Sequence, residues 1–336
     1  MHEWAELRHF RYLLKILERQ GFRVAAEELH TSQPNLTVQA RQFQEYASVR
    51  LFRRLRNGSI RPTETGIAFI SMARLLLDTC DEVIDALAAI ERGEIRTARF
   101  GCCTLADPGL FRNFCAAHKS ILPGCSIRPT LGDTEQLAEE IVNGSVDAAL
   151  VTLPLEHPEL CIEELRRDPL VVCLRRDSAL ARNHKVQTSD LQGNLSILHH
   201  PKRHPRAHAK LLQHLAESGI EVEDYSHASH PSEMQMLVRE GHGLSLIRDG
   251  TPLDDELTTR PIAGVDWTID TAIAYHKRRH PKTIPILVRK LKKQLDRIPR
   301  ERTSPAAPQV LRHSESDGKR PPCGVENPAV QLELYR

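Results

Sequence analysis

Residues 22–43 constrain the fold more than any other stretch of this chain. Two short segments with helical apolar periodicity meet there, and only residues 30–32 separate them. Ser32 can cap the second segment by accepting a backbone N–H bond, and Pro34 is tolerated because first-turn amides have no partner within the helix. The stretch therefore predicts two helices joined by a tight turn.

The second of these helices has two distinct faces. Leu36, Ala40 and Phe43 recur at i, i+4 and i+7 and point one stripe inward. The opposite face carries Gln33, Pro34, Thr37, Val38 and Arg41. A short helix, a tight turn and a second helix with an exposed polar first turn are typical of the helix-turn-helix that enters the major groove of DNA.

Three blocks in the first ninety residues resemble the LysR-type transcriptional regulators. They are Ala25-Ala26-Glu27-Glu28-Leu29-His30-Thr31-Ser32-Gln33-Pro34-Asn35-Leu36-Thr37, then Val49-Arg50-Leu51-Phe52, then Thr63-Glu64-Thr65-Gly66. The alternative is a small helical core with a polar face in an unrelated protein, which would not explain the agreement beyond the helices. The resemblance implies a winged helix-turn-helix domain over residues 1–63 that binds double-stranded DNA. The expected DNA-binding residues are Gln33, Pro34, Asn35, Thr37, Val38, Arg41, Arg54 and Arg61.

Base contacts are expected from the first turns of the second helix. Gln33 can pair bidentately with adenine, while Pro34, Thr37 and Val38 can touch thymine methyl groups or exclude other bases. Val38 stands where most members of the family carry Arg or Lys, so less contact with guanine is expected there.

Charge is unevenly distributed along the chain. The whole sequence has a net charge of +2, but residues 1–63 contain 11 Lys and Arg against 6 Asp and Glu, which leaves −3 for the rest. A hairpin is predicted over residues 49–61, because Asn57-Gly58 is a favoured tight turn. Its arginines are Arg50, Arg53, Arg54, Arg56 and Arg61. A solvated charge run is the alternative to a DNA wing that contacts phosphates.

A long helix is predicted from Glu64 to about Arg92, capped by Thr63 and closed by Gly93. At 1.5 Å per residue it would be about 42 Å long. Two parallel apolar stripes follow it: Phe69, Met72, Leu76, Val83, Ala86 and Ile90, and Ile70, Ala73, Leu77, Cys80, Ile84 and Leu87. Burial against its own chain is one explanation. The resemblance instead implies a linker helix, residues 64–93, that packs on its copy in a homodimer or homotetramer through Phe69, Leu76 and Val83.

From Thr97 onward, short strands alternate with helices, which indicates α/β units on a parallel or mixed sheet. The predicted strands are 98–102, 126–131, 147–151, 170–174, 196–198, 244–247 and 272–275, and the predicted helices are 111–118, 134–143, 206–218, 233–240 and 285–295. The blocks 143–151 and 241–247 resemble the two-lobed effector domain of the same family, which is similar to periplasmic solute-binding proteins. Residues 94–296 would form it, with one lobe over 95–165 plus the last helix and the other over 166–270.

Three loops at strand ends are candidates for an effector site, because ligands of open α/β sheets bind there, against helix N-termini. Family positions implied by the resemblance are Cys103, Thr104, Leu105, Thr134, His199 and His200, and the cationic loop adds Lys202 as a candidate. The first loop departs from the family pattern, since Thr104 lies one residue early and two cysteines precede it. The donors have no acidic partner nearby in sequence, which predicts an anionic effector such as a small organic acid.

Other chemistry receives less support. His200, His204 and His208 recur every four residues and suggest a metal sensor, but Pro201 and Pro205 interrupt the helical spacing. Vicinal Cys102 and Cys103 suggest a redox sensor, with small buried residues at a strand end as the plainer explanation. No catalytic motif is present, and Asp133 and Glu135 have no evident acid or base partner, so neither enzymatic activity nor a cofactor or metal is expected.

The compartment and the tail complete the prediction. No signal peptide and no apolar run of membrane-spanning length is evident, and the eight cysteines lack Cys-x-x-Cys spacing, which favours a cytoplasmic protein with no membrane partner. Residues 297–336 lack periodicity and are predicted to be disordered. The sequence thus indicates a DNA-binding regulator controlled by a small molecule. A non-exported small-molecule-binding module whose N-terminal domain binds a protein is the alternative, and an enzyme built on the cleft comes third.

Overall fold

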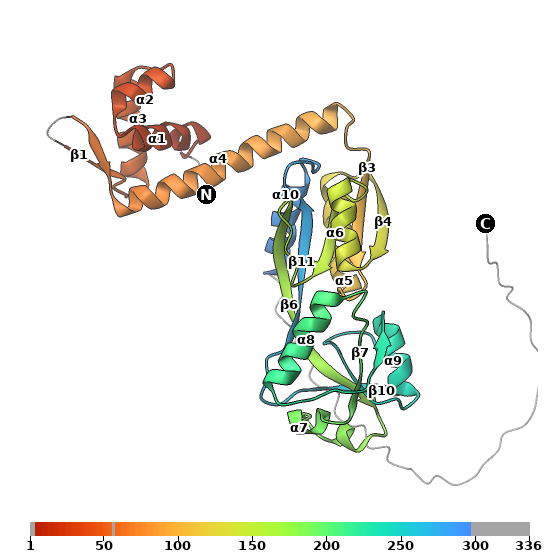
Figure 1. Ribbon diagram of the computed structural model, residues 1–336. Helices are drawn as coiled ribbons and strands as arrows, with labels where there is room; N and C mark the ends of the chain where they lie inside the picture. Colours follow the sequence, from red (N-terminus) through yellow and green to blue (C-terminus); the bar gives the residue numbers. More distant parts are fainter. Residues whose placement is uncertain (1–3, 56–57, 297–336) are drawn as a thin grey trace, which may run out of the picture. The chain divides into compact units, whose positions relative to one another are not determined.

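The computed structural model describes residues 4–55 and 58–296 (Figure 1). Its N-terminal region contains α1 (Leu7–Arg19), α2 (Phe22–Glu28), α3 (Gln33–Tyr46), β1 (Phe52–Arg54) and β2 (Ile60–Pro62). The two strands pair antiparallel as a hairpin beside the three helices. This is the winged helix-turn-helix that the sequence predicts.

The caps and the core of α3 follow from its sequence. Ser32 Oγ accepts a hydrogen bond from the backbone N–H of Asn35 at 3.3 Å and so begins the helix. Leu36, Ala40 and Phe43 are all buried against α1 and α2. The predicted inward stripe is therefore confirmed, and it fixes which face of α3 remains outside.

The hairpin is shorter than the sequence suggested. Residues 49–51 are not in a strand, because the backbone N–H of Leu51 donates to the side chain of Gln44 on α3 at 2.8 Å. The predicted turn residues Arg56 and Asn57 lie outside the described residues.

Helix α4 (Glu64–Glu91) begins and ends as predicted. Thr63 Oγ1 accepts from the N–H of Gly66 at 3.0 Å, and Gly93 takes the left-handed backbone (φ +69°) that glycine tolerates. One assignment on this helix is wrong: Phe69 is 9% exposed and stacks on Phe10 inside the N-terminal core, so its own chain already covers it. The exposed large apolar residues of α4 are Ile67, Met72, Leu75, Leu76, Val83, Ile84 and Leu87.

The first lobe of the remaining chain is an α/β unit. Its strands β3 (Thr97–Cys103), β4 (Ser126–Gly132) and β5 (Ala148–Thr152) are parallel and in the order β4-β3-β5. The helices α5 (Pro108–Ile121), α6 (Thr134–Asn143) and α10 (Ile284–Leu295) cover it. β11 (Thr268–His276) extends the sheet antiparallel to β5.

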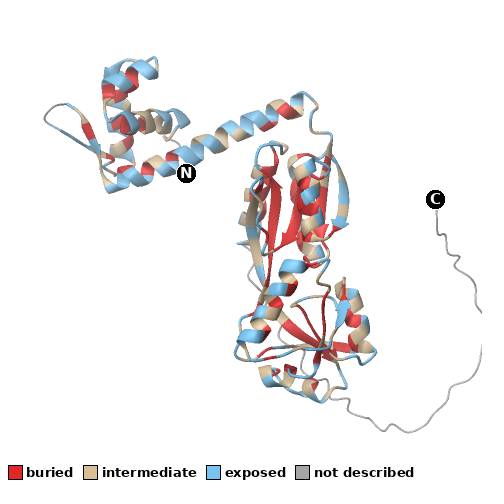
Figure 2. Cartoon of the chain, viewed as in Figure 1, coloured by how far each residue is buried: buried red, intermediate tan, exposed pale blue. Residues whose placement is uncertain are grey.

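The second lobe repeats this plan. It contains β7 (Leu195–His199), β8 (Ser226–Ala228), β9 (Leu244–Arg248) and β10 (Leu257–Pro261), with α8 (Pro205–Glu217) and α9 (Pro231–Arg239) packed on them and the short η1 (Ala179–Arg182) and α7 (Thr188–Leu191) nearby. β7 is parallel to both β8 and β9. Figure 2 shows that the strands carry most of the buried residues of both lobes.

The strand β6 (Leu160–Arg175) joins the lobes. Residues 160–169 pair with β11 in the first lobe, and residues 170–175 pair with β9 and β10 in the second. The predicted strand 170–174 is only the second half of it. Since β6 is continuous across the boundary, the loops at the strand ends of the two lobes face each other across a cleft, whose lining is described below.

Candidate functional site

The outward face of α3 carries residues expected to meet DNA. Gln33, Pro34, Asn35 and Val38 are exposed and Thr37 is half-buried. Two of them are engaged locally: Asn35 Nδ2 donates to Thr31 Oγ1 at 3.0 Å, and Thr37 Oγ1 donates to the backbone carbonyl of Gln33 at 2.9 Å. Gln33 and Val38 therefore present the freest side chains at this end of the helix.

A groove of about 710 Å³ lies between α3 and the hairpin. It is lined by Phe22, Thr37, Arg41, Gln44, Glu45, Ser48, Val49, Arg50, Phe52 and Arg54. Arg41 forms an ion pair with Glu45 at 2.7 Å, and the guanidinium of Arg54 lies 5.1 Å from the centre of the Phe22 ring. Arg61 is exposed on β2, opposite Arg53. Concave, arginine-rich surfaces of this kind suit a phosphate backbone.

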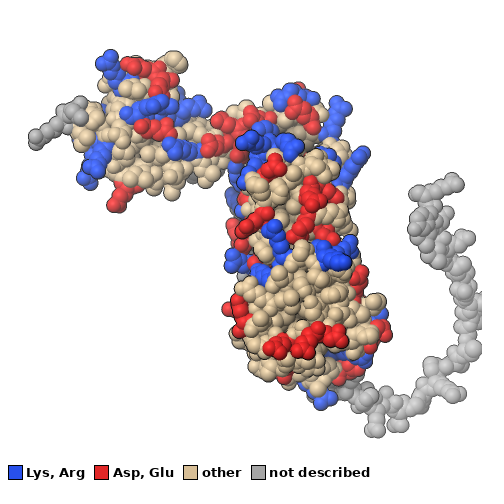
Figure 3. All heavy atoms as spheres, viewed as in Figure 1, with Lys and Arg blue, Asp and Glu red and all other residues tan. Residues whose placement is uncertain are grey.

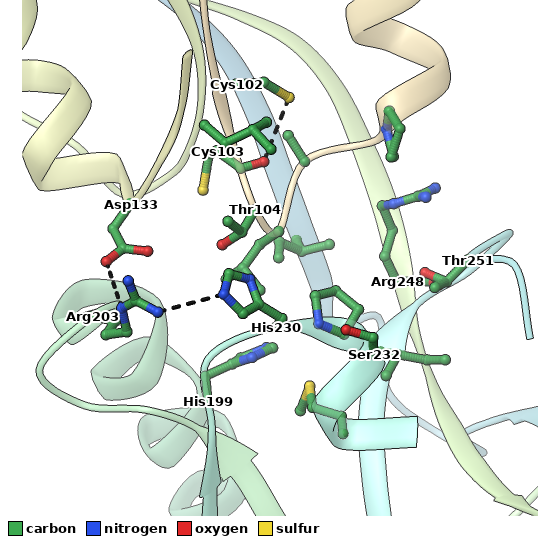
Figure 4. A pocket seen from close by; sticks show the side chains of 18 of the residues that line it. Cys102, Cys103, Thr104, Asp133, His199, Arg203, His230, Ser232, Arg248 and Thr251 are labelled. Atoms are coloured by element: carbon green, nitrogen blue, oxygen red, sulfur yellow. Dashed lines mark hydrogen bonds and ion pairs between the residues drawn. The ribbon is translucent and has the colours of Figure 1, made fainter. Parts of the chain in front are cut away.

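A second cavity, about 520 Å³ in volume, lies between the two lobes (Figure 4). Four predicted residues line it: Cys103, Thr104, Leu105 and His199. Asp133 and Arg203, which belong to two of the candidate loops, also line it, whereas nothing in the sequence indicated Gln136, His230, Ser232, Arg248 and Thr251. Its apolar wall includes Leu105, Pro108, Phe111, Leu131, Met234, Ile247 and Ile269. Such a cavity has the size and mostly apolar lining of a small-molecule site.

Three predicted cleft residues do not line the cavity. Thr134 is buried below it, where its hydroxyl contacts Thr152 Oγ1 at 2.9 Å and accepts from the backbone N–H of Thr152 at 3.1 Å. His200 accepts from the backbone N–H of Lys202 at 3.1 Å and lies beside the His227 ring, and Lys202 is exposed in that turn. The lining of the cavity therefore does not include Thr134, His200 or Lys202, and their contact with an effector stays a prediction.

One end of the cavity contains Arg248, at the end of β9. Its side chain is 9% exposed; Nη1 donates to the carbonyl of Asp249 at 2.9 Å, and Nη2 lies 3.5 Å from Asp107 of the first lobe. Beside it, Ser232 lies in the first turn of α9, whose N-cap His230 makes no capping hydrogen bond. A guanidinium with one close acceptor thus lies beside helix amides that lack a side-chain cap.

Asp107 is shared by two arginines, Arg248 and Arg166, and the charge of Arg248 also acts on Asp168. The Oδ2 atom of Asp107 accepts from Arg166 at 2.7 Å, and Arg166 also contacts Asp168 at 2.9 Å. Burial acts to raise the pKa of Asp107, but the hydrogen bonds from Arg166 and Gly109 and the charge of Arg248 keep it below its usual value. Asp107 is therefore ionised and chiefly engaged by Arg166.

The opposite end contains an ion pair between the lobes. Asp133, the N-cap residue of α6, accepts from Arg203 of the second lobe at 3.0 Å. Asp133 thus supplies the acidic partner that the sequence did not reveal, and the basic loop is neutralised at that point. The distance in sequence, 70 residues, is why no local pattern predicted the pair.

Two further groups that line the cavity, His199 and Cys102, are held in their neutral forms by burial. Burial, aided by His204 and His208, lowers the pKa of His199 to about 3, and burial raises the pKa of Cys102 to about 12. A thiol that stays protonated is a poor nucleophile, which weighs against the redox hypothesis for Cys102. Residues 4–55 and 58–296 contain no group of three or more His, Cys, Asp or Glu placed to hold a metal ion.

The three histidines of the hypothetical metal site have separate partners. His204 contacts Ser229 and Thr104, and His208 Nε2 contacts the hydroxyl of Tyr225 at 3.2 Å.

On the face shown in Figure 3, acidic and basic side chains are interspersed over the two lobes. None of the described helices is long and apolar enough to cross a bilayer.

Comparisons with known proteins agree with this architecture. Residues 7–67 match the family described as bacterial regulatory helix-turn-helix protein, lysR family, and residues 91–296 match the LysR substrate binding domain. Together these define a DNA-binding transcriptional regulator with an effector-binding domain. The chain belongs to the LysR family, and the alternative of a free-standing binding module is not supported.

Individual relatives are distant. The chain is similar to the transcriptional regulator AlsR of Bacillus subtilis (23% identical, covering 82% of this chain and 91% of AlsR) and to the RuBisCO operon transcriptional regulator of Allochromatium vinosum (26%, 77% and 84%). Its fold is similar to full-length BenM, with a TM-score of 0.53 and 23% sequence identity over 87% of this chain and 97% of BenM. It is also similar to full-length CbnR in complex with its target DNA, with a TM-score of 0.51 and 19% identity over 87% of this chain and 100% of CbnR.

Proposed function

We propose that this regulator binds its operator through α3 and the hairpin, and that a small anionic effector in the cleft changes that binding. Gln33, Pro34 and Val38 would read bases, while Arg41, Arg54 and Arg61 would contact phosphates. In this proposal, residues 1–63 form the DNA-binding domain, residues 64–93 the linker helix and residues 94–296 the effector-binding domain. The protein would act in the cytoplasm as a homodimer or homotetramer, and its role would be regulatory rather than catalytic.

The observation that carries the effector proposal is the environment of Arg248. Its guanidinium has one backbone acceptor at 2.9 Å and a more distant carboxylate at 3.5 Å, so it can still accept an anion. The uncapped first turn of α9 beside it adds N–H donors and a favourable dipole. A carboxylate at this end of the cavity could bind both the Arg248 guanidinium and the N–H groups of the first turn of α9.

The rest of the cavity favours an apolar body on that carboxylate. Leu105, Phe111 and Met234 face the space, and His199, neutral at physiological pH, offers one hydrogen bond without a charge. Because Asp133 already neutralises Arg203, a second anionic group would find less support at the far end. We infer a monocarboxylic acid with a mainly apolar body.

Thermal shift tests this with a panel of monocarboxylic acids and their neutral amides. An acid that binds the folded state raises the melting temperature, and its amide should not. Arg248→Gln should weaken binding of the active acid roughly ten- to hundredfold, the value of a charged hydrogen bond of about 1.5–3 kcal/mol. Arg239→Gln, which removes an exposed arginine of the same lobe, is the control. Equal responses to acid and amide would show that the cleft does not select a negative charge.

A further inference from the structure

His204 is a buried histidine at the boundary between the lobes. It belongs to the second lobe, where it is the N-cap residue of α8 and is 2% exposed. Its Nε2 atom lies 3.2 Å from the carbonyl of Ser229 in its own lobe. From the first lobe, Thr104 Oγ1 approaches the same nitrogen to 3.4 Å and Asp133 Oδ1 to 3.7 Å.

These contacts determine which nitrogen carries the proton. A carbonyl can only accept, so Nε2 is protonated and donates to Ser229. The other nitrogen, Nδ1, is buried with no hydrogen-bond partner among the residues that the structure describes. The closed cleft therefore accommodates a neutral imidazole, and a second proton on Nδ1 would be buried without an acceptor.

The charged and titratable neighbours of His204 come from four elements. Asp133 of α6 favours the cationic ring, and its Oδ1 atom is itself buried without a hydrogen-bond donor in the described chain. Arg203, which directly precedes His204, and His230, which precedes α9, disfavour a positive charge on the His204 ring. His199 of β7, whose ring centre lies 6.1 Å away, remains neutral. Burial outweighs the attraction of Asp133 and lowers the pKa of His204.

We propose that closure of the two lobes requires His204 to be neutral, so that a proton on this residue opens the cleft. The proposed effector would then bind less tightly in acid, a consequence that rests on the proposed function of the cleft. The coupling itself depends only on the contacts of His204 across the boundary.

The sign of the effect follows from linkage. Under this proposal, opening would expose His204 to solvent and return its pKa toward the ordinary value of about 6.5. In the structure, burial lowers that pKa. Closure is therefore most favourable above the open-form pKa and is lost as the pH falls through it. One linked proton changes the closed-to-open ratio by at most about tenfold per pH unit.

Single-molecule FRET measures that ratio without any ligand. Dyes attached through unnatural amino acids at Glu139 of the first lobe and Gln192 of the second, both exposed, report lobe separation in a labelled chain diluted with unlabelled chain. In the full-length protein, the closed fraction should fall between pH 7.5 and 5.5. In His204→Gln, whose amide can still donate to Ser229, this dependence should vanish.

Two further variants make the test specific. His208→Gln should retain the pH dependence of the parent, because the contact of His208 with Tyr225 lies within one lobe and does not change on closure. Asp133→Asn should close less at every pH, having lost its pair with Arg203, yet keep the dependence. If circular dichroism shows that His204→Gln is unfolded, His204→Asn replaces it. An unchanged pH dependence in the folded His204 variant, or its loss in Asp133→Asn, would overturn the proposal.

Discussion

The N-terminal domain and the cleft differ in how their sites are built. On α3, the residues that would face DNA lie within a single stretch, 33–41, and one cap and one apolar stripe determine which side is exposed. The cavity between the lobes draws on segments far apart in sequence, from Cys102 to Ile269. A site on one helix can be read from periodicity, whereas a site between lobes depends on which loop residues turn inward.

The largest expected effect concerns α4, which carries seven exposed large apolar residues. If a second chain covers this face, Leu76→Glu buries an unpaired charge in the interface, which costs about 3–5 kcal/mol. Light scattering should then show a monomer in place of the parent oligomer, and tight operator binding should be lost. Here the periodicity predicts the helix, but only an assembly measurement identifies what covers it.

The control for this substitution is a charge change on the polar side of the same helix. Asp85→Lys alters the net charge by a larger amount at an exposed position outside both apolar stripes, so the oligomer should persist. If light scattering gives Leu76→Glu the same assembly mass as the parent, the apolar face of α4 is covered by residues of its own chain.

A smaller effect is expected at Thr134, where sequence and structure disagree. Thr134→Val leaves the backbone N–H and the hydroxyl of Thr152 without a close partner, so the lobe should lose about 1–3 kcal/mol of stability. Urea unfolding measures this loss, and ligand affinity in the folded protein should stay near that of the parent. Weaker ligand binding with unchanged stability would show that the Thr134 hydroxyl contacts the ligand.

Most of the fold could be predicted, because apolar periodicity specifies individual elements. Helix α6 matches its predicted range, residues 134–143. The first half of β6 was missed, since most of residues 160–169 are only partly buried and they include the charged Arg166, Arg167 and Asp168. β10 was missed for the same reason: it is half-buried and has no continuous apolar run.

The cleft was predicted only in part, for a physical reason. Their positions at strand ends predicted that Cys103, Thr104, Leu105 and His199 line the cleft, because the carboxyl ends of parallel strands meet at one edge of the sheet, where ligands bind. The same rule, applied to the end of β9, could have found Arg248. The pair of Asp133 with Arg203 could not be found this way, since it exists only when the two lobes face each other.

The last two substitutions separate base reading from phosphate contact in the N-terminal domain. Gln33→Ala removes a group that can pair with adenine, so it should cost roughly 1–3 kcal/mol at the preferred operator and little on random DNA. Arg61→Gln removes a phosphate contact, so it should weaken binding to both and make the slope of log affinity against log salt shallower by about 0.9. Fluorescence anisotropy at several salt concentrations measures both quantities. Equal losses on operator and random DNA for Gln33→Ala would mean that the exposed first turn of α3 does not read bases, and an unchanged slope for Arg61→Gln would remove β2 from the interface.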